Sequence, residues 1–136
     1  MRKKLFLILV LFASVAVAQQ PFKGKFYNQE YSSNLFIDLY EESIVVPGME
    51  MFGPMNGYLK GGIYGVWTIT SFTLSDDDAT ATIRLSNDLG SETQEVSLVL
   101  LNDSTLSFEQ QGSIVIKKAV NKKLVKTERK LTFVRK

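Results

Sequence analysis

The stretch that decides the fold is ATATIRLSNDLGSETQEVSLVLL, residues 79–101. Apolar and polar residues alternate through residues 79–86 and again through residues 93–101, as in strands with one buried face. The segment between them, residues 87–91, is rich in residues that favour turns. Residues 79–101 therefore predict a β-hairpin. Its expected inward-facing side chains are Ala79, Ala81, Ile83, Leu85, Val96, Leu98 and Leu100.

Short runs of the same kind continue in both directions along the chain. They span residues 22–31, 34–40, 43–46, 66–75, 105–110, 114–116 and 130–135, with a last loop expected over residues 119–123. The connections are too short for parallel crossovers, which take about a dozen residues or more. We therefore expect an all-β fold, a single antiparallel meander of about eight strands closed into a barrel. The alternative is a two-sheet β-sandwich, which needs longer connections between strands.

The N-terminus has the three parts of a secretory signal peptide. Basic residues 2–4 precede an apolar run over residues 5–17, and Ala16-Val17-Ala18 supplies a small-x-small cleavage site. The run is shorter than the ~20 apolar residues of a membrane-spanning helix, so we expect no membrane span. We predict a signal peptide at residues 1–18 and one all-β domain at residues 19–136, located in the periplasm or secreted.

Composition removes most catalytic chemistry. The chain has no Cys and no His, which excludes thiolate nucleophiles, Ser–His pairs, imidazole zinc sites and the usual near-neutral base. The cluster Asp76–Asp78 reads as a solvated turn, because three adjacent carboxylates do not form the cage that Ca²⁺ needs. No spacing selects a pair of carboxylates for glycoside hydrolysis among Glu41, Glu42 and Glu109. We expect no enzyme activity, no metal and no cofactor.

Residues 48–65 differ from the rest of the chain. They hold six glycines and three methionines beside Phe52, Tyr58 and Tyr64, which is too Gly-rich for a helix and too long for a simple turn. Long loops are often functional, and methionine beside aromatic residues suits adaptable apolar binding. The segment is either a lip over the barrel mouth that contacts a ligand, or a loop that folds back and fills the core. The candidate ligand-binding residues are Met51, Phe52, Met55, Tyr58 and Tyr64 at the mouth, with Trp67 inside the barrel.

Charge is distributed unevenly along the chain. Residues 19–116 carry four basic and thirteen acidic residues, whereas residues 117–136 carry nine basic residues and Glu128 alone. The basic segment could bind an anionic partner. Alternatively, its lysines could protect a sheet edge against aggregation. Export makes nucleic acid the least suitable partner, and we expect none.

Two short motifs resemble a known family. Gly24-Lys25-Phe26 near the start and Leu131–Arg135 near the end resemble the terminal signature of lipocalins and fatty-acid-binding proteins. In that signature a G-x-W opens the first strand, and a basic residue of the last strand caps the aromatic ring. Here Phe26 stands at the Trp position, and the resemblance implies that Arg135 caps it by a cation–π contact. The only true G-x-W, Gly65-Val66-Trp67, lies in mid-chain.

The chain as a whole resembles small secreted lipocalin-like (calycin-like) barrel proteins, which implies eight strands and a small apolar ligand. An eight-stranded barrel has room either for packed side chains or for one small ligand. We therefore expect an exported, non-enzymatic binding protein of one of two kinds. It carries a small apolar or amphipathic molecule in the barrel, or it is an interaction or inhibitor module that binds an envelope protein and has no ligand cavity.

Overall fold

The computed structural model describes residues 20–89 and 91–136. The predicted signal peptide, residues 1–18, lies outside them. The elements, in chain order, are β1 (Lys23–Asn28), β2 (Ser33–Asp38), the 3₁₀ turn η1 (Glu50–Phe52), β3 (Gly57–Gly61), β4 (Trp67–Leu74), β5 (Thr80–Asn87), β6 (Thr93–Asn102), β7 (Thr105–Gln110), β8 (Lys117–Val120), β9 (Lys123–Lys126) and β10 (Lys130–Arg135).

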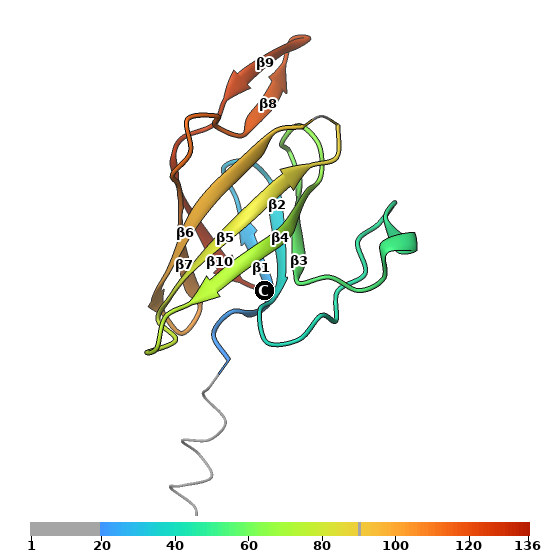
Figure 1. Ribbon diagram of the computed structural model, residues 1–136. Coiled ribbons are helices and arrows are strands. Elements are labelled where there is room, and N and C mark those ends of the chain that lie inside the picture. The colour runs from blue at the N-terminus through green and yellow to red at the C-terminus, as the bar shows by residue number, and fades with distance from the viewer. Residues whose placement is uncertain (1–19, 90) are drawn as a thin grey trace, which may run out of the picture.

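Eight of the strands close into one antiparallel barrel (Figure 1), with the neighbour order β1-β10-β7-β6-β5-β4-β3-β2. Strands β8 and β9 form a separate two-stranded sheet between β7 and β10 in the sequence. The prediction of a closed meander is therefore confirmed, and the two-sheet sandwich was the wrong alternative. Within the described residues, no helix is long and apolar enough to cross a membrane.

The hairpin of β5 and β6 follows the alternation that predicts it. Ile83 lies opposite Val96, and Ala81 lies opposite Leu98. All four side chains are buried, whereas Arg84 points to solvent from the same strand. The ends of the predicted inward face, Ala79 and Leu100, are partly buried. The period-2 pattern thus identifies the face that points into the barrel.

Three expectations about strand positions were wrong. Residues 48–65 are not one loop, because Gly57–Gly61 forms β3. A Cβ on Gly57 would lie 2.1 Å from the carbonyl oxygen of Phe36, so glycine there allows β3 to approach β2 closely. Residues 43–46 make only an isolated bridge between Ile44 and Met55. No strand forms over residues 114–116, because β8 begins at Lys117. The loop expected over residues 119–123 is found, and it holds the turn of the β8–β9 hairpin.

The barrel interior is occupied by one continuous cluster of buried apolar side chains. Its largest members, each less than 2% exposed, include Trp67, Phe22, Phe26, Phe108, Phe133, Leu35, Ile37 and Leu59. Burying a side chain of this size contributes about 1.5–3 kcal/mol. Since the chain has no cysteine, this packing and the strand ladders hold the fold together.

Strands β1 and β10 close the barrel through a short ladder of two residue pairs, Phe26 with Arg135 and Tyr27 with Val134. The guanidinium of Arg135 lies 4.6 Å from the centre of the Phe26 ring. Its Nη1 donates to the carbonyl of Lys23 at 2.6 Å, and its Nη2 donates to the carbonyl of Pro21 at 3.0 Å. The cap on Phe26 that the lipocalin resemblance implies is therefore present. Glycine at position 24 leaves room for it, because a Cβ there would lie 2.7 Å from Nη1.

We predict that Arg135→Ala lowers the free energy of unfolding by about 2 kcal/mol, because it removes a cation–π contact and charged hydrogen bonds together. Arg135→Lys should recover less than half of that loss, since an ammonium cannot donate to both carbonyls as the planar fork does. Urea denaturation followed by the fluorescence of Trp67 measures both changes. Unfolding midpoints equal to that of the unaltered protein would contradict the assignment.

Candidate functional site

The structure does not bring the six candidate ligand-binding residues into one site. Met51 and Phe52 lie in and around η1, far along the connection between β2 and β3, and Met55 lies in the bridge near its base. Tyr58 is on the outer side of β3, where its ring stacks on Phe36. Trp67 belongs to the core cluster, and Tyr64 is exposed beyond the other end of β3. The expected lip over a barrel mouth is not formed.

Residues 41–56, which we call the arm, extend away from the barrel wall (Figure 1), with η1 near the far end. Met51 is 84% exposed and Phe52 is 69% exposed, the highest values among the described large apolar side chains. No residue of η1 is buried. The tip therefore adds no packing to the barrel while it presents apolar surface to solvent, as interaction sites do.

Asp38, at the end of β2, anchors the base of the arm. Its carboxylate is buried and accepts hydrogen bonds from the backbone N–H groups of Tyr40 and Glu41, at 3.0 and 3.1 Å, and from the hydroxyl of Ser43 at 2.6 Å. The backbone of Asp38 also pairs with Asn56, which leads into β3. These bonds join the two ends of the arm, so its position relative to the barrel is defined.

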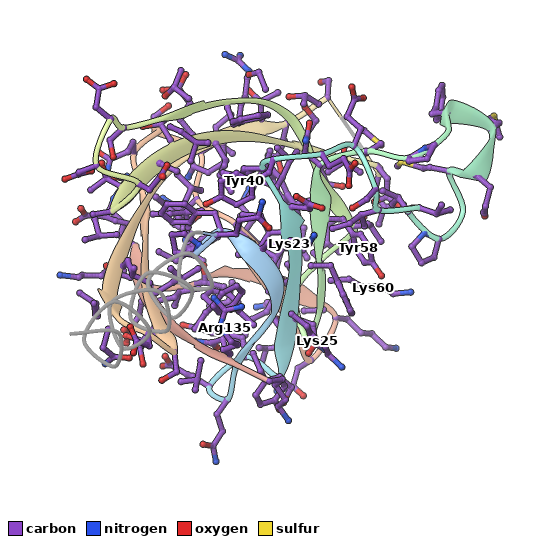
Figure 2. All side chains as sticks on the ribbon, turned by 90° about the horizontal axis from the view of Figure 1, so that it is seen from below. Lys23, Lys25, Tyr40, Tyr58, Lys60 and Arg135 are labelled. Carbon is purple, nitrogen blue, oxygen red and sulfur yellow. The ribbon has the colours of Figure 1, made fainter. Side chains whose placement is uncertain are left out.

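Tyr58 lies under the first residues of the arm, on the outer side of the barrel (Figure 2). Its ring centre is 4.7 Å from that of Phe36. A hollow of about 370 Å³ borders Tyr58, and arm residues 43–45 line its other side. Burial raises the pKa of the Tyr58 hydroxyl above its ordinary value.

The β8–β9 hairpin is a second projection, at one end of the barrel (Figure 1). Asn121 and Lys122 connect the strands with positive φ angles of 50° and 67°, the geometry of a type I′ turn. None of its eight strand residues is buried. An isolated two-stranded hairpin is marginally stable in water, so its base has to hold it in place.

Two buried glutamines form that base. The side-chain oxygen of Gln110 accepts from the amide of Ile116 at 2.8 Å and from Gln94 at 3.1 Å. The Gln110 side-chain nitrogen donates to Thr127 at 3.1 Å and to the carbonyl of Glu128 at 2.9 Å. Ile116 and Thr127 immediately flank the hairpin and are themselves hydrogen-bonded. This network fixes both legs of the hairpin to β7.

The sequence carries a signal for these glutamines that our reading did not use. Gln94 shares the inward parity of Val96 in β6, and Gln110 shares that of Phe108 in β7. A polar residue at an inward position needs buried partners. Gln94 and Gln110 find their partners at the end of the barrel, where β6 and β7 meet the segments that flank the β8–β9 hairpin.

No protein-family model matches the chain. No curated protein and no solved structure is significantly similar to it. The two projections are therefore the features of the molecule that bear on its function.

We predict that Gln110→Leu lowers the free energy of unfolding by about 3 kcal/mol, because it leaves several buried polar groups without partners. The amide of Ile116 should exchange its hydrogen much faster, since its acceptor is gone. The neighbouring Gln111→Leu is the matched control, because Gln111 is exposed, and its effect should stay within about 0.5 kcal/mol. Equal effects of the two substitutions would contradict a special role for Gln110.

A second prediction concerns alkaline pH. Burial raises the folded-state pKa of both Tyr58 and Tyr40, and for Tyr40 the charges of Asp78 and Asp38 add to the effect. The unfolded chain therefore loses these protons first, and the free energy of unfolding falls as the pH rises above about 10. Tyr58→Phe keeps the ring and should make this fall smaller. Urea denaturation at about pH 9 to 11 tests it, and an unchanged slope would be the opposing result.

Proposed function

We propose that this protein is a non-enzymatic interaction module that binds a partner protein through the tip of the arm. The observation that carries the proposal is the exposure of Met51 and Phe52 on a segment whose base is hydrogen-bonded to the buried Asp38. A side chain of that size loses about 1.5–3 kcal/mol of burial free energy if it stays in water. Binding a protein surface recovers that free energy, whereas folding does not.

The packing of the barrel supports this choice over a carrier of a small molecule. Trp67, expected to face a ligand, is 1% exposed within the core cluster, and its indole N–H donates to the carbonyl of Tyr64 at 3.2 Å. The protein itself thus buries the Trp67 ring and provides the hydrogen-bond acceptor for its indole N–H. The carrier hypothesis would move to a hollow on the outside of the barrel, either the one beside Tyr58, of about 370 Å³, or the larger one bordered by β1 and β10, of about 890 Å³.

Enzyme activity has no support in the arrangement of ionisable groups. Asp38, the one buried carboxylate among the described residues, accepts two hydrogen bonds from the arm and one from Tyr40 immediately before it. A carboxylate used in this way is a structural anchor. With the expected export of residues 19–136, the partner would be an envelope protein or a protein outside the cell.

The double variant Met51→Ser, Phe52→Ser tests whether the two apolar side chains at the tip of the arm stabilise the folded protein. We expect its free energy of unfolding to stay within about 0.5 kcal/mol of that of the unaltered protein, because both side chains already contact mainly water. Thermal and urea unfolding measure this. A loss of more than about 2 kcal/mol would mean that the tip packs in the native state and would remove the basis of the proposal.

Photo-crosslinking in the producing cell tests the binding itself. Benzoylphenylalanine at position 52 should give one discrete protein adduct, and the same probe at position 101 should give none. Leu101 is a suitable control because it is also apolar and exposed, at 56%, but belongs to a barrel strand. Serine at position 51 should reduce the adduct. Native mass spectrometry of residues 19–136 with a bound small molecule, and no protein adduct at position 52, would instead favour the carrier.

A further inference from the structure

The β8–β9 hairpin is the most basic part of the chain. Residues 117–126 contain five lysines and no acidic residue. Two of these lysines have partners on the barrel: Nζ of Lys117 lies 3.4 Å from the carboxylate of Glu92, and Nζ of Lys118 lies 5.0 Å from the centre of the Tyr31 ring. In the described part of the chain, no carboxylate lies within ion-pair distance of the other three, which are Lys122, Lys123 and Lys126.

Apolar side chains lie between these lysines on both faces of the hairpin. Ala119 pairs with Leu124, and Val120 pairs with Lys123. Because neighbouring residues of a strand point to opposite faces, Leu124 lies on one face while Val120 and Val125 lie on the other. Leu124 is 49% exposed, Val125 is 43% exposed and Val120 is 40% exposed. The hairpin is thus a wedge with exposed apolar side chains on both faces, with Lys122 and Lys123 at its turn and Lys126 at its base opposite Lys117.

Protection of a sheet edge does not account for this wedge. Lysines on an edge strand oppose aggregation, but the exposed Leu124 and Val125 beside them would work against that protection. The network around Gln110 also fixes the base of the hairpin to the end of the barrel. A device that only blocks an edge would need no such support.

We propose that the β8–β9 hairpin docks on the surface of an anionic lipid bilayer. A protein partner covers one face of a hairpin, whereas the interface of a bilayer surrounds a wedge that enters it, so both apolar faces are buried at once. Lys126, near the base, then lies among anionic headgroups, and Lys122 and Lys123 reach the headgroups by extending their long side chains back from the turn. Each such contact contributes binding free energy. Lys117 and Lys118 remain with their partners at the base.

The arm and the hairpin would have separate roles under this proposal. The hairpin lies at the end of the barrel where β6 begins and β7 ends, beside Gln94 and Gln110. The arm joins β2 to β3 and contacts none of these residues through the hydrogen bonds that anchor it. Binding through one element therefore leaves the other available, and the two can be tested independently.

Vesicle binding by residues 19–136 is the test. The protein should co-sediment with vesicles of phosphatidylcholine and phosphatidylglycerol at a ratio of about seven to three, but not with phosphatidylcholine alone, and salt should weaken the binding. Lys122→Glu with Lys123→Glu should weaken it at least ~25-fold, from about fivefold for each lysine removed. The control is Lys25→Glu with Lys60→Glu on the barrel wall (Figure 2), which changes the net charge equally and should weaken binding far less.

A tryptophan reporter tests insertion. In Leu124→Trp the added fluorescence should shift to the blue with anionic vesicles, whereas in Leu101→Trp, at the opposite end of β6, it should not. The proposal is overturned by failure to bind anionic vesicles, or by equal loss of binding in the two charge-reversal variants. It is also overturned if soluble polyglutamate binds the hairpin and Leu124→Trp shows no shift, because the partner is then an acidic polypeptide. None of these results depends on the arm.

Discussion

The guanidinium of Arg135 over the ring of Phe26 joins the last barrel strand to the first, and the remaining architecture depends on this junction. An open sheet of eight strands would expose two unpaired edges, and closure removes them. The ladder between β1 and β10 has only two residue pairs. The side chain of Asn28 adds a bond to the carbonyl of Thr132, at 3.0 Å, where the backbones no longer pair. The side chains of Arg135 and Asn28 thus complete the junction between β1 and β10, where the backbone ladder has only two residue pairs.

Once closed, the barrel leaves little of its interior for other uses, and the features that call for another explanation lie outside it. Both projections are built in the same way. A buried polar residue at the end of a barrel strand, Asp38 for the arm and Gln110 for the hairpin, holds both ends of the projecting segment. Gln110 does so through its side chain, whereas Asp38 binds one end through its carboxylate and the other through its backbone. Buried polar groups are costly unless all their hydrogen bonds are made. At both positions most of these bonds are made to the projecting segment or to residues that flank it, so the cost of burial is offset in full only when that segment is in place.

Alternation of apolar and polar residues was enough to predict the strands of the barrel wall from residue 66 to residue 110, because each has one buried face. It failed where that condition fails. Strand β3 is short and begins and ends with glycine, and the hairpin strands bury neither face. The cap by Arg135 was predictable because it rests on a short local motif at each end of the domain.

The candidate binding residues could not be placed from the sequence for a related reason. Tyr64 and Trp67 are three residues apart, yet one is exposed and the other is in the core, because β4 begins at Trp67 and Tyr64 lies before it. Met51 and Tyr58 are also close in sequence, but the arm carries the first away from the wall that holds the second. Apart from Ile116, which is six residues from Gln110, the buried partners of Gln94 and Gln110 lie 16 to 20 residues away. Hydrogen bonds between residues so far apart in the sequence depend on the order of the strands in the barrel, which a single sequence does not specify.

The contact between Arg135 and Lys23 spans 112 residues of chain, and this has a consequence for the order of events during synthesis. Strands β1 and β2 leave the ribosome first, but the partner of the free edge of β1 is made last. For most of translation, therefore, β1 has an edge that nothing in the nascent chain can cover. Contacts of such separation carry the largest loop-closure entropy and are typical of slowly folding domains. The barrel is thus expected to close only after β10 has been synthesised.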